Sequence, residues 1–404
     1  MSSTLFLPKK SPSLVGTFQI SGSKSESNRL LILNRLFGNP IEIRNLSNSD
    51  DTHALIRALE TDSTVVDIGH AGTAMRFLTA YFANTEGRTT ILTGSERMRQ
   101  RPIGILVNAL RMLDAEIEYL ENKGFPPLII TGKKLTGIRV VAEAGISSQF
   151  ISALMLIAPS LPDGLEIELQ GNITSQPYLV MTLRLLQQLG IEAIQAGSNI
   201  RISPTKSIQP QEFMVESDWS SASYFYAFAA LSETAEIQLN SFRENSLQGD
   251  AAVAGIFEKY FGVKTEFKKG GIFLTKQKSN AVSKIELDLN DHPDLAQTLA
   301  VCCAGLKIPF RFSGLHTLKI KETDRLLSLQ NELRKIGAET EVTENSIAIL
   351  NFFKPNAHPV IQTWDDHRMA LSFSAYSMMA ELTIENPEVV HKSYPNFWVD
   401  ISRL

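Results

Sequence analysis

Cysteine and long apolar runs are scarce in this sequence of 404 residues. Its two cysteines, Cys302 and Cys303, are adjacent and leave no spaced framework for disulfides or zinc. No apolar run approaches the roughly 18 residues that a membrane-spanning helix needs. The opening MSSTLFLPKK also lacks the apolar core of a signal peptide. We therefore expect a cytoplasmic protein without a membrane partner.

An excess of charge of one sign is also missing, because the formal net charge is only -4. A nearly balanced chain does not attract nucleic acid through its overall field, so any anion site must be a local cluster of cations. The stretch Gly22-Ser23-Lys24-Ser25 is not a P-loop, since Ser23 separates Gly22 from Lys24. No G-x-G-x-x-G follows a strand-like stretch, and no H-E-x-x-H spacing occurs. The sequence thus predicts no metal and no cofactor.

What the chain does contain is a long internal repeat. Four segments read as a helix end, a small residue, a strand, a turn and a strand, anchored 72 to 76 residues apart at Leu113, Leu189, Phe261 and Ile336. This period is too long for a solenoid and fits one βαβαββ-sized unit.

A second series lies between these segments. Six helices are expected to begin in small or polar residues and to continue as apolar bodies, with starts near Lys24, Gly72, Ser147, Trp219, His292 and Asp366. Such helices are buried and have accessible N-termini. Ordinary N-capping would explain any one of these helix starts. Six starts that recur at a regular spacing favour a chain of two halves, each with three units. The break is predicted near VESDWSSAS, and the early strand-like TLFLPKK is expected to belong with the second half.

Basic residues cluster at these helix starts and in short loops. They are Lys24, Arg29, Arg76, Arg101, Lys321, Arg325, Arg368 and Lys392. Helix N-termini and cations together suit small substrates that carry phosphate and carboxylate groups. Any one of these cations could instead be solvated or salt-bridged. The carboxylates Asp294 and Glu322 stand in cation-flanked settings, where capping or salt bridging is an equally good interpretation. His367, which follows two aspartates, could be a hydrogen-bonded residue at a helix start or an active group.

Several motifs resemble one family. SGSKSESNR, GHAGTAMRFL and LTGSERMRQRPIG are similar to the PGSKS-x-SNR, GNAGTAMRPL and LTG-x-x-RM-x-x-RPIG motifs of 5-enolpyruvylshikimate-3-phosphate synthases. ISSQF, SQPY, SDWSSASYF, HPD, KIKETDRL, DDHRMA and HKSYPNF follow in the family's order. The resemblance covers essentially the whole chain, from about Lys24 to Phe397.

The resemblance implies a two-domain inside-out α/β barrel in which each domain contains three βαβαββ repeats. Domain 1 would comprise residues 1–21 plus 217–404 and domain 2 residues 22–216. The active site would lie in the interdomain cleft, with hinges near Ile20–Gly22 and Glu216–Asp218. A monomer without a cofactor is implied. So is the activity of 3-phosphoshikimate 1-carboxyvinyltransferase (EC 2.5.1.19), a glyphosate-inhibited step of aromatic amino acid biosynthesis.

The resemblance also implies site residues, carried over motif by motif. Asp294, Glu322, Lys24 and His367 are the candidate catalytic residues. The implied contacts of shikimate 3-phosphate are Lys24, Ser25, Arg29, Ser147, Ser148, Gln149, Ser175, Tyr178, Asp294 and Lys321. The implied contacts of phosphoenolpyruvate are Lys24, Gly72, Arg101, Gln149, Arg325, Arg368 and Lys392. Arg76 matches a family arginine for which we expect a structural role.

Two departures from the family pattern flank the Gly72 loop. His70 stands where the family usually has Asn, and Phe77 stands where it has Pro. We expect an altered response to glyphosate, which a comparison of inhibition constants for the natural chain and Phe77→Pro would test.

Two alternatives stay open. The first is the related enolpyruvyl transfer to UDP-N-acetylglucosamine, whose family typically has Lys-Asn in the opening motif and a reactive loop cysteine. Here the opening is Lys24-Ser25, and the two cysteines fall in an apolar helix. The second is a non-catalytic anion-binding protein, against which the presence of both Asp294 and Glu322 argues.

Overall fold

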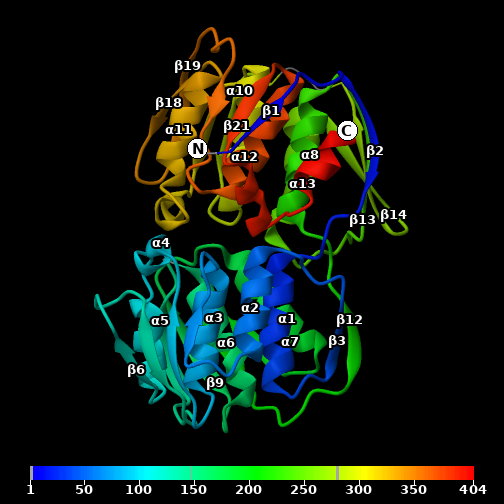
Figure 1. Ribbon diagram of the computed structural model, residues 1–404. Coiled ribbons are helices and arrows are strands. Elements are labelled where there is room, and N and C mark those ends of the chain that lie inside the picture. The colour runs from blue at the N-terminus through cyan, green and yellow to red at the C-terminus, as the bar shows by residue number, and fades with distance from the viewer. Residues whose placement is uncertain (1–2, 146, 279–281) are drawn as a thin grey trace. The chain divides into compact units, whose positions relative to one another are not determined.

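The structure is a computed structural model that describes residues 3–145, 147–278 and 282–404. The chain divides into two compact units (Figure 1). Unit 1 comprises residues 1–21 and 216–404, and unit 2 comprises residues 22–215. Among the described residues, no helix combines the length and apolar character needed to cross a membrane.

Unit 2 contains seven α-helices and ten strands within its described residues. The helices are α1 (Lys24–Leu36), α2 (Asp50–Glu60), α3 (Gly72–Ala83), α4 (Glu96–Arg99), α5 (Gly104–Met112), α6 (Ser148–Ile157) and α7 (Gln176–Gln188). The 3-10 helix η1 (Ala158–Ser160) directly follows α6. The strands are β3 (Ile41–Arg44), β4 (Val65–Asp67), β5 (Thr89–Thr93), β6 (Glu116–Tyr119), β7 (Leu128–Thr131), β8 (Arg139–Glu143), β9 (Leu165–Gln170), β10 (Ala193–Ala196), β11 (Asn199–Ile202) and β12 (Gln211–Met214).

Unit 1 is built from the remaining elements. Its helices are α8 (Trp219–Leu231), α9 (Val253–Phe261), α10 (Ala296–Leu306), α11 (Arg325–Lys335), α12 (His367–Ser374) and α13 (Phe397–Ser402). Its 3-10 helices are η2 (Gly249–Ala252), η3 (Pro293–Leu295), η4 (His316–Ile320), η5 (Ala375–Met378) and η6 (Pro387–Lys392). Its strands are β1 (Thr4–Leu7), β2 (Ser13–Phe18), β13 (Thr234–Asn240), β14 (Val263–Lys268), β15 (Gly271–Lys276), β16 (Ile285–Asp288), β17 (Phe310–Ser313), β18 (Ala338–Val342), β19 (Ile347–Phe352), β20 (Val360–Ile361) and β21 (Leu382–Glu385).

Four sheets share one strand arrangement, in which a parallel pair is followed by an antiparallel hairpin. Their orders are β4-β5-β7-β6, β8-β9-β11-β10, β2-β13-β15-β14 and β16-β17-β19-β18. In each sheet a helix crosses between the parallel strands and a second helix precedes the hairpin, which is the predicted βαβαββ repeat. The α/β fold class expected from the sequence is confirmed, and the anchors Leu113, Leu189, Phe261 and Ile336 lie where α5, α7, α9 and α11 end.

The third repeat of each unit is shorter and is assembled from distant segments. In unit 2, β3 pairs in parallel with β12. In unit 1, β21 pairs in parallel with β20 and antiparallel with β1. The early strand therefore belongs with the second half of the chain, as the sequence predicted. Unit 2 is an insertion between β2 and α8 of unit 1.

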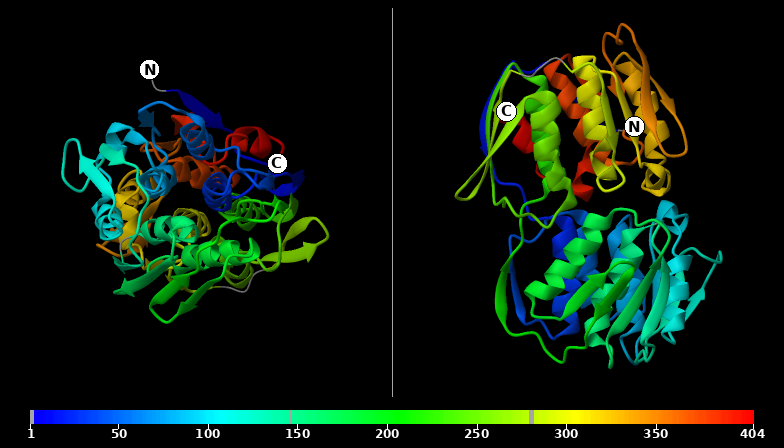
Figure 2. Two further views of the ribbon diagram at one scale, coloured as in Figure 1. Left: turned by 90° about the horizontal axis from the view of Figure 1, so that it is seen from below. Right: turned by 180° about the vertical axis from the view of Figure 1, so that it is seen from behind.

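The core of each unit lies between its helices and the inner faces of its sheets. Seen from below in Figure 2, the strands of unit 2 run around the rim and its helices lie inside. Helix α3 is apolar around most of its circumference and almost wholly buried, and α8 of unit 1 shares this property. The sheets instead alternate buried and exposed residues, as in β9. The polar side chains of the candidate site lie at helix starts rather than at strand ends.

Candidate functional site

Lys24 of unit 2 is the first residue of α1 and stands on a capped helix start. The Ser23 hydroxyl accepts a hydrogen bond from the Glu26 N–H, which fixes the first turn. The Lys24 Nζ donates to Asp51 Oδ2 at 3.1 Å. The Asp51 side chain is 5% exposed and the Lys24 side chain 18%. A buried carboxylate thus holds the ammonium of Lys24 at the positive end of α1.

Arg29, one turn further along α1, is a fully buried cation. Its Nε donates to Thr182 Oγ1 at 2.7 Å, its Nη2 to Ser152 Oγ at 3.1 Å and its Nη1 to the carbonyl of Ser25 at 2.9 Å. Its guanidinium also lies 5.3 Å from the ring centre of Phe77. Burial lowers the pKa of Arg29 to about 10, so the group stays charged near neutral pH. Hydroxyl and carbonyl groups and an aromatic ring thus surround this cation, and the charge of Glu26 also stabilises it.

The start of α3 fits closely around Arg101. A Cβ atom added to Gly72 would lie 2.6 Å from Arg101 Nη1, so only glycine leaves room for this guanidinium. Arg76 donates from Nη1 to the Gly72 carbonyl and from Nη2 to the Pro102 carbonyl, both at 3.1 Å. Arg76 thereby ties α3 to the loop that carries Arg101, which supports its expected structural role.

The starts of α6 and α7 complete the polar surroundings in unit 2. The Ser147 side chain caps α6 by accepting from the Gln149 N–H, and Gln149 Nε2 donates to Thr73 Oγ1, beside Gly72, at 3.2 Å. Ser148 is buried. Ser175 occupies the N-cap position of α7 without a side-chain capping hydrogen bond, and its backbone is left-handed with φ of 56°. Non-glycine residues rarely adopt this conformation, and those that do cluster at functional positions. Tyr178 follows in the first turn of α7, and its carbonyl accepts from Arg29 Nη2 at 3.4 Å.

In unit 1, Arg325 joins three carboxylates at the start of α11. Its Nε donates to Asp366 Oδ2 at 2.5 Å, its Nη1 to Asp294 Oδ1 at 2.9 Å and its Nη2 to Glu322 Oε2 at 2.8 Å. Burial would lower the pKa of Arg325, but Asp366, Glu322 and Asp294 raise it above its ordinary value. The side chain is 2% exposed, so Arg325 fixes the relative positions of the two candidate catalytic carboxylates.

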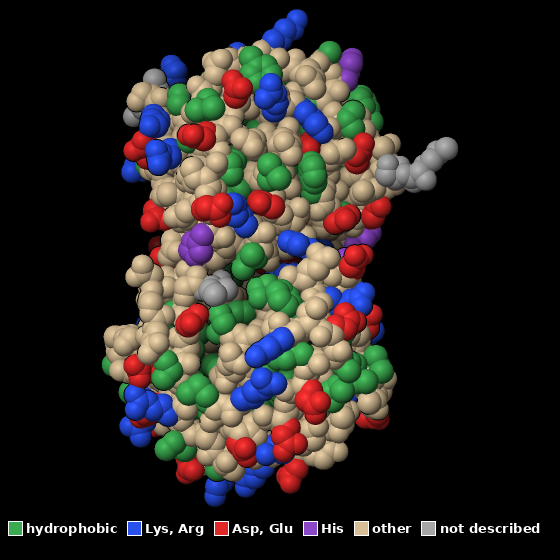
Figure 3. Space-filling model, turned by 90° about the vertical axis from the view of Figure 1, so that its left-hand side faces the viewer, with side chains coloured by type: hydrophobic (Ala, Val, Ile, Leu, Met, Phe, Trp, Pro, Cys, Tyr) green, Lys and Arg blue, Asp and Glu red, His purple; other side chains and the backbone are tan. Residues whose placement is uncertain are grey.

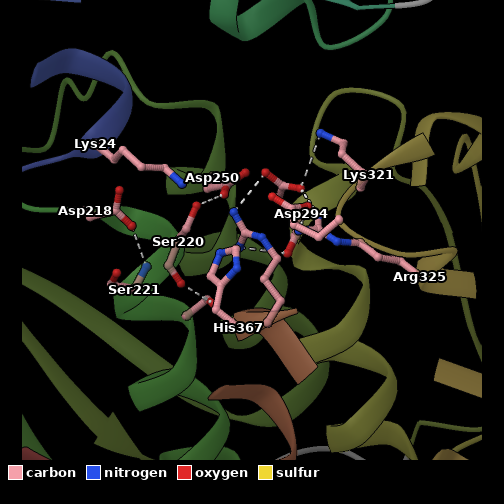
Figure 4. Close-up of polar contacts among 12 residues, drawn as sticks. Lys24, Asp218, Ser220, Ser221, Asp250, Asp294, Lys321, Arg325 and His367 are labelled. Carbon is pink, nitrogen blue, oxygen red and sulfur yellow. Dashed lines mark hydrogen bonds and ion pairs between the residues drawn. The ribbon is translucent and has the colours of Figure 1, made fainter. Parts of the chain in front are cut away.

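Three further cations surround these carboxylates. Arg368, in the first turn of α12, donates from Nη2 to Asp294 Oδ2 at 2.9 Å. The Nζ of Lys321 lies 3.9 Å from Asp294 Oδ1, and the Nζ of Lys392 lies 3.7 Å from Glu322 Oε1. Figure 4 shows Lys321, Asp294 and Arg325 converging from separate elements of unit 1. Unit 1 therefore brings together every unit 1 residue that the sequence assigned to the site.

The charge state of Asp294 follows from this arrangement. Burial alone would raise its pKa, but Arg368, Lys321 and Arg325 outweigh burial and hold the pKa well below its usual range. Asp294 is thus a carboxylate at neutral pH.

His367, a candidate catalytic residue, is only 2% exposed. Its Nδ1 lies 3.4 Å from Asp366 Oδ1 at the start of α12. This burial favours the helix-start interpretation over direct proton exchange with a substrate. His70 by contrast is exposed, and its Nδ1 lies 3.0 Å from Ser95 Oγ.

Sequence reasoning did not assign four polar residues that contact the candidate site. Asp51 holds Lys24, Asp366 holds Arg325, and Tyr224 hydroxyl accepts from Arg368 Nη1 at 3.3 Å. Asp250 accepts a short hydrogen bond from Ser220 (Figure 4). Burial, and then the charge of Asp294, raise the pKa of Asp250. Of these residues only Asp366 carried a sequence signal, as the polar residue before an apolar helix.

Within residues 3–145, 147–278 and 282–404, no group of three or more His, Cys, Asp or Glu side chains is arranged to hold a metal ion. Figure 3 shows acidic and basic side chains interspersed on one face of each unit.

Comparison with known proteins supplies the family. The model of the EPSP synthase family, 3-phosphoshikimate 1-carboxyvinyltransferase, matches residues 53–401. A 3-phosphoshikimate 1-carboxyvinyltransferase of Bacteroides fragilis is 46% identical over 390 residues, which cover 96% of this chain and 94% of that protein. The chain belongs to the EPSP synthase family.

Other EPSP synthases agree with this assignment. The enzyme of Haemophilus influenzae is 36% identical over 425 residues, covering 96% of each chain. A solved EPSP synthase of Acinetobacter baumannii has a TM-score of 0.78 at 22% identity and covers 100% of this chain and 98% of its own, which supports the fold.

Proposed function

We propose that this EPSP synthase transfers the enolpyruvyl group of phosphoenolpyruvate to the 5-hydroxyl of shikimate 3-phosphate and releases inorganic phosphate. This is the reaction of its family in the shikimate pathway, which leads to aromatic amino acids. The observation that carries the proposal is the Arg325 arrangement, which holds the carboxylates of Asp294 and Glu322 beside Arg368, Lys321 and Lys392.

The reaction needs cations because both substrates are polyanions. Each phosphate carries about 1.5 to 2 negative charges near neutral pH, and each substrate has a carboxylate as well. We assign the shikimate 3-phosphate contacts to Lys24, Ser25, Arg29, Ser147, Ser148, Gln149, Ser175, Tyr178, Asp294 and Lys321. We assign the phosphoenolpyruvate contacts to Lys24, Gly72, Arg101, Gln149, Arg325, Arg368 and Lys392. Holding both substrates in place removes the entropic barrier of a bimolecular step.

The chemistry proceeds by addition and elimination. Protonation of the methylene carbon of phosphoenolpyruvate leaves an electron-poor carbon, which the 5-hydroxyl attacks while it loses its proton. The tetrahedral intermediate then loses a proton from its methyl group together with phosphate. Each step moves a proton, which a positioned carboxylate or ammonium can accept or donate.

Two carboxylates are assigned to these proton transfers. Asp294 orients the 5-hydroxyl, and Glu322 exchanges the proton of the enolpyruvyl carbon. Anionic substrates that bind Arg368 and Lys321 partly neutralise the positive charges beside Asp294. This raises the pKa of Asp294 and makes Asp294 a better base. Lys24 contacts both substrates and stabilises the charge of the departing phosphate.

A phosphate-release assay tests this proposal. The purified chain should release phosphate from phosphoenolpyruvate only when shikimate 3-phosphate is present, and not with UDP-N-acetylglucosamine. Release with the sugar nucleotide would replace our assignment with the related transferase, and release with neither would favour the anion-binding alternative.

Two variants test the residue roles. Lys24→Ala and Glu322→Ala should lose at least about a hundredfold in kcat, the range of general acid–base contributions, while staying folded. Lys133→Ala is the control, because the ion pairs of Lys133 with Asp114 and Glu116 lie at the surface. Near-normal turnover in either variant would remove that residue from the mechanism. The monomeric state and cytoplasmic location stay predictions.

A further inference from the structure

Two consecutive residues before α12 have backbone conformations that their side chains disfavour. Trp364 has φ of 54° and Asp365 has φ of 53°, both in the left-handed region. A bulky residue such as tryptophan is rare there, and such conformations persist only where surrounding contacts enforce them. The next residue is Asp366, the N-cap of α12 and the partner of Arg325.

The enforcing contacts come from Glu332 of α11, whose side chain is fully buried. Its Oε2 accepts from the backbone N–H of Gln362 and its Oε1 from the indole Nε1 of Trp364, each at 3.0 Å. One carboxylate therefore binds both Gln362 and Trp364, the residues on either side of Thr363. Trp364 is 39% exposed, so part of its indole lies at the surface beside this hydrogen bond.

The same helix also holds the far side of the turn. Arg325 and Glu332 are seven residues apart, which places them two turns apart on one face of α11. Arg325 binds Asp366, and Asp366 Oδ1 in turn accepts from the backbone N–H of Arg368 at 2.9 Å. The position of the turn along α11 thus sets the position of Asp366, and through it the start of α12 that carries Arg368.

We propose that Glu332 and Trp364 are positioning residues, whose hydrogen bond holds the turn 362–366 so that Arg368 is placed to bind phosphoenolpyruvate. The inference rests on the proposed function of Arg368. Neither residue contacts the reacting atoms. Their effect reaches the substrate through Asp366 and the first turn of α12.

Trp364→Phe is the decisive variant, because it keeps an aromatic ring at an exposed position and removes only the indole N–H. We expect the KM for phosphoenolpyruvate to rise about tenfold, the scale of a hydrogen bond to a charged group. The KM for shikimate 3-phosphate should rise by a smaller factor, because Arg368 is assigned to phosphoenolpyruvate and affects shikimate 3-phosphate indirectly, through its hydrogen bond to Asp294. Glu332→Gln should act in the same direction, and the double variant should be no worse than the poorer single one, since both remove one interaction.

Arg334→Met is the matched control. Arg334 lies on the same helix with a 72% exposed side chain, and its 3.8 Å ion pair with Glu339 is separate from both hydrogen bonds to the turn. This variant should lower the Tm slightly and leave the KM for phosphoenolpyruvate unchanged.

The two possible failures are distinguishable. If the natural chain releases no phosphate from phosphoenolpyruvate with shikimate 3-phosphate, the proposed function and this inference both fall. If the natural chain is active but Trp364→Phe lowers only the Tm, with an unchanged KM for phosphoenolpyruvate, the pair is merely structural and the inference alone is overturned.

Discussion

Gly72 and Arg101 illustrate how one missing side chain shapes the candidate site. The Arg101 guanidinium occupies the space that a Cβ at position 72 would need. Arg101 is 7% exposed, so this contact is part of the interior of unit 2. Glycine at position 72 therefore lets the Arg101 guanidinium approach the backbone closely, and it is not needed there for an unusual backbone angle.

Gly72→Ala should displace the Arg101 guanidinium and raise the KM for phosphoenolpyruvate about tenfold, because Arg101 is an assigned contact. The Tm should change little, since the clash falls on the far end of a long side chain. Steady-state kinetics and thermal unfolding measure the two effects. Gly255→Ala is the control, because a Cβ there meets nothing within 4 Å. An unchanged KM in Gly72→Ala would mean that Arg101 does not bind this substrate.

The contribution of Asp250 to the free energy of unfolding should fall as the pH rises. Its pKa in the folded chain is raised by burial and by Asp294 above the ordinary value of about 3.9. The folded state then binds the extra proton, and its contribution is complete below the unfolded-state pKa and is lost as pH rises through the folded-state pKa.

Asp250→Asn removes this titration. Its free energy of unfolding, relative to that of the natural chain, should increase between pH 4 and pH 7 in urea titrations. Glu266→Gln should show the opposite trend, because hydrogen bonds from Lys264 and Lys268 lower the pKa of Glu266. A pH-independent difference for Asp250→Asn would show that Asp250 is not protonated in the folded chain.

The sequence indicated which residue types would matter, but it could not indicate their partners. Lys24 and Arg325 were found because cations at capped helix starts follow a local pattern. Asp250 and Asp51 were missed because their pairing with Ser220 and Lys24 depends on contacts between separate elements. The left-handed Trp364 was missed for a related reason: its hydrogen-bond partner Glu332 lies thirty-two residues earlier in the chain.

At the scale of elements, Lys276 joins the ends of two helices. Its Nζ donates to the Ala230 carbonyl near the end of α8 and to the Phe261 carbonyl at the end of α9, both at 2.7 Å. Helix C-termini leave carbonyl groups unpaired and carry partial negative charge, so an ammonium there satisfies both needs.

Lys276→Met should lower the free energy of unfolding by about 2 kcal/mol, since it leaves buried carbonyl groups without their charged donor. Urea unfolding measures the change. Lys264→Met, which removes an exposed pair with Glu266, should change it by less than about 1 kcal/mol. Equal effects of the two substitutions would contradict the helix-end role.

The helices could be predicted from the sequence more fully than the sheets. Six helix starts were expected, and α1, α3, α6, α8 and α12 begin within a residue of those positions, while the turn η3 precedes α10. The pairing of β3 with β12 joins residues that are about 170 positions apart, and no local periodicity encodes such a partner. The incomplete third repeats became clear only from these pairings.

At the scale of the whole molecule, the tryptophans report on one unit. All three, Trp219, Trp364 and Trp398, belong to unit 1, and unit 2 contains none. Each unit also has its own apolar core, so each can lose its structure separately.

Leu154→Ala tests this independence, because Leu154 is fully buried in α6 of unit 2. The substitution should cost about 2–5 kcal/mol and shift only part of the unfolding curve followed by circular dichroism. The tryptophan fluorescence transition should keep its midpoint. Leu299→Ala in α10 of unit 1 is the counterpart that should move the fluorescence transition. If Leu154→Ala shifted both signals together, the units would unfold as one.

The pairing of β1 with β21 has a consequence for synthesis on the ribosome. Residues 4–7 hydrogen-bond with residues 382–385, and β2 pairs with β13. The described strands and helices of unit 2 have all been translated by residue 215, whereas β1 has no β21 partner until residues 382–385 have been made. The inserted unit can therefore reach its native form while β1 still waits for its partner strand.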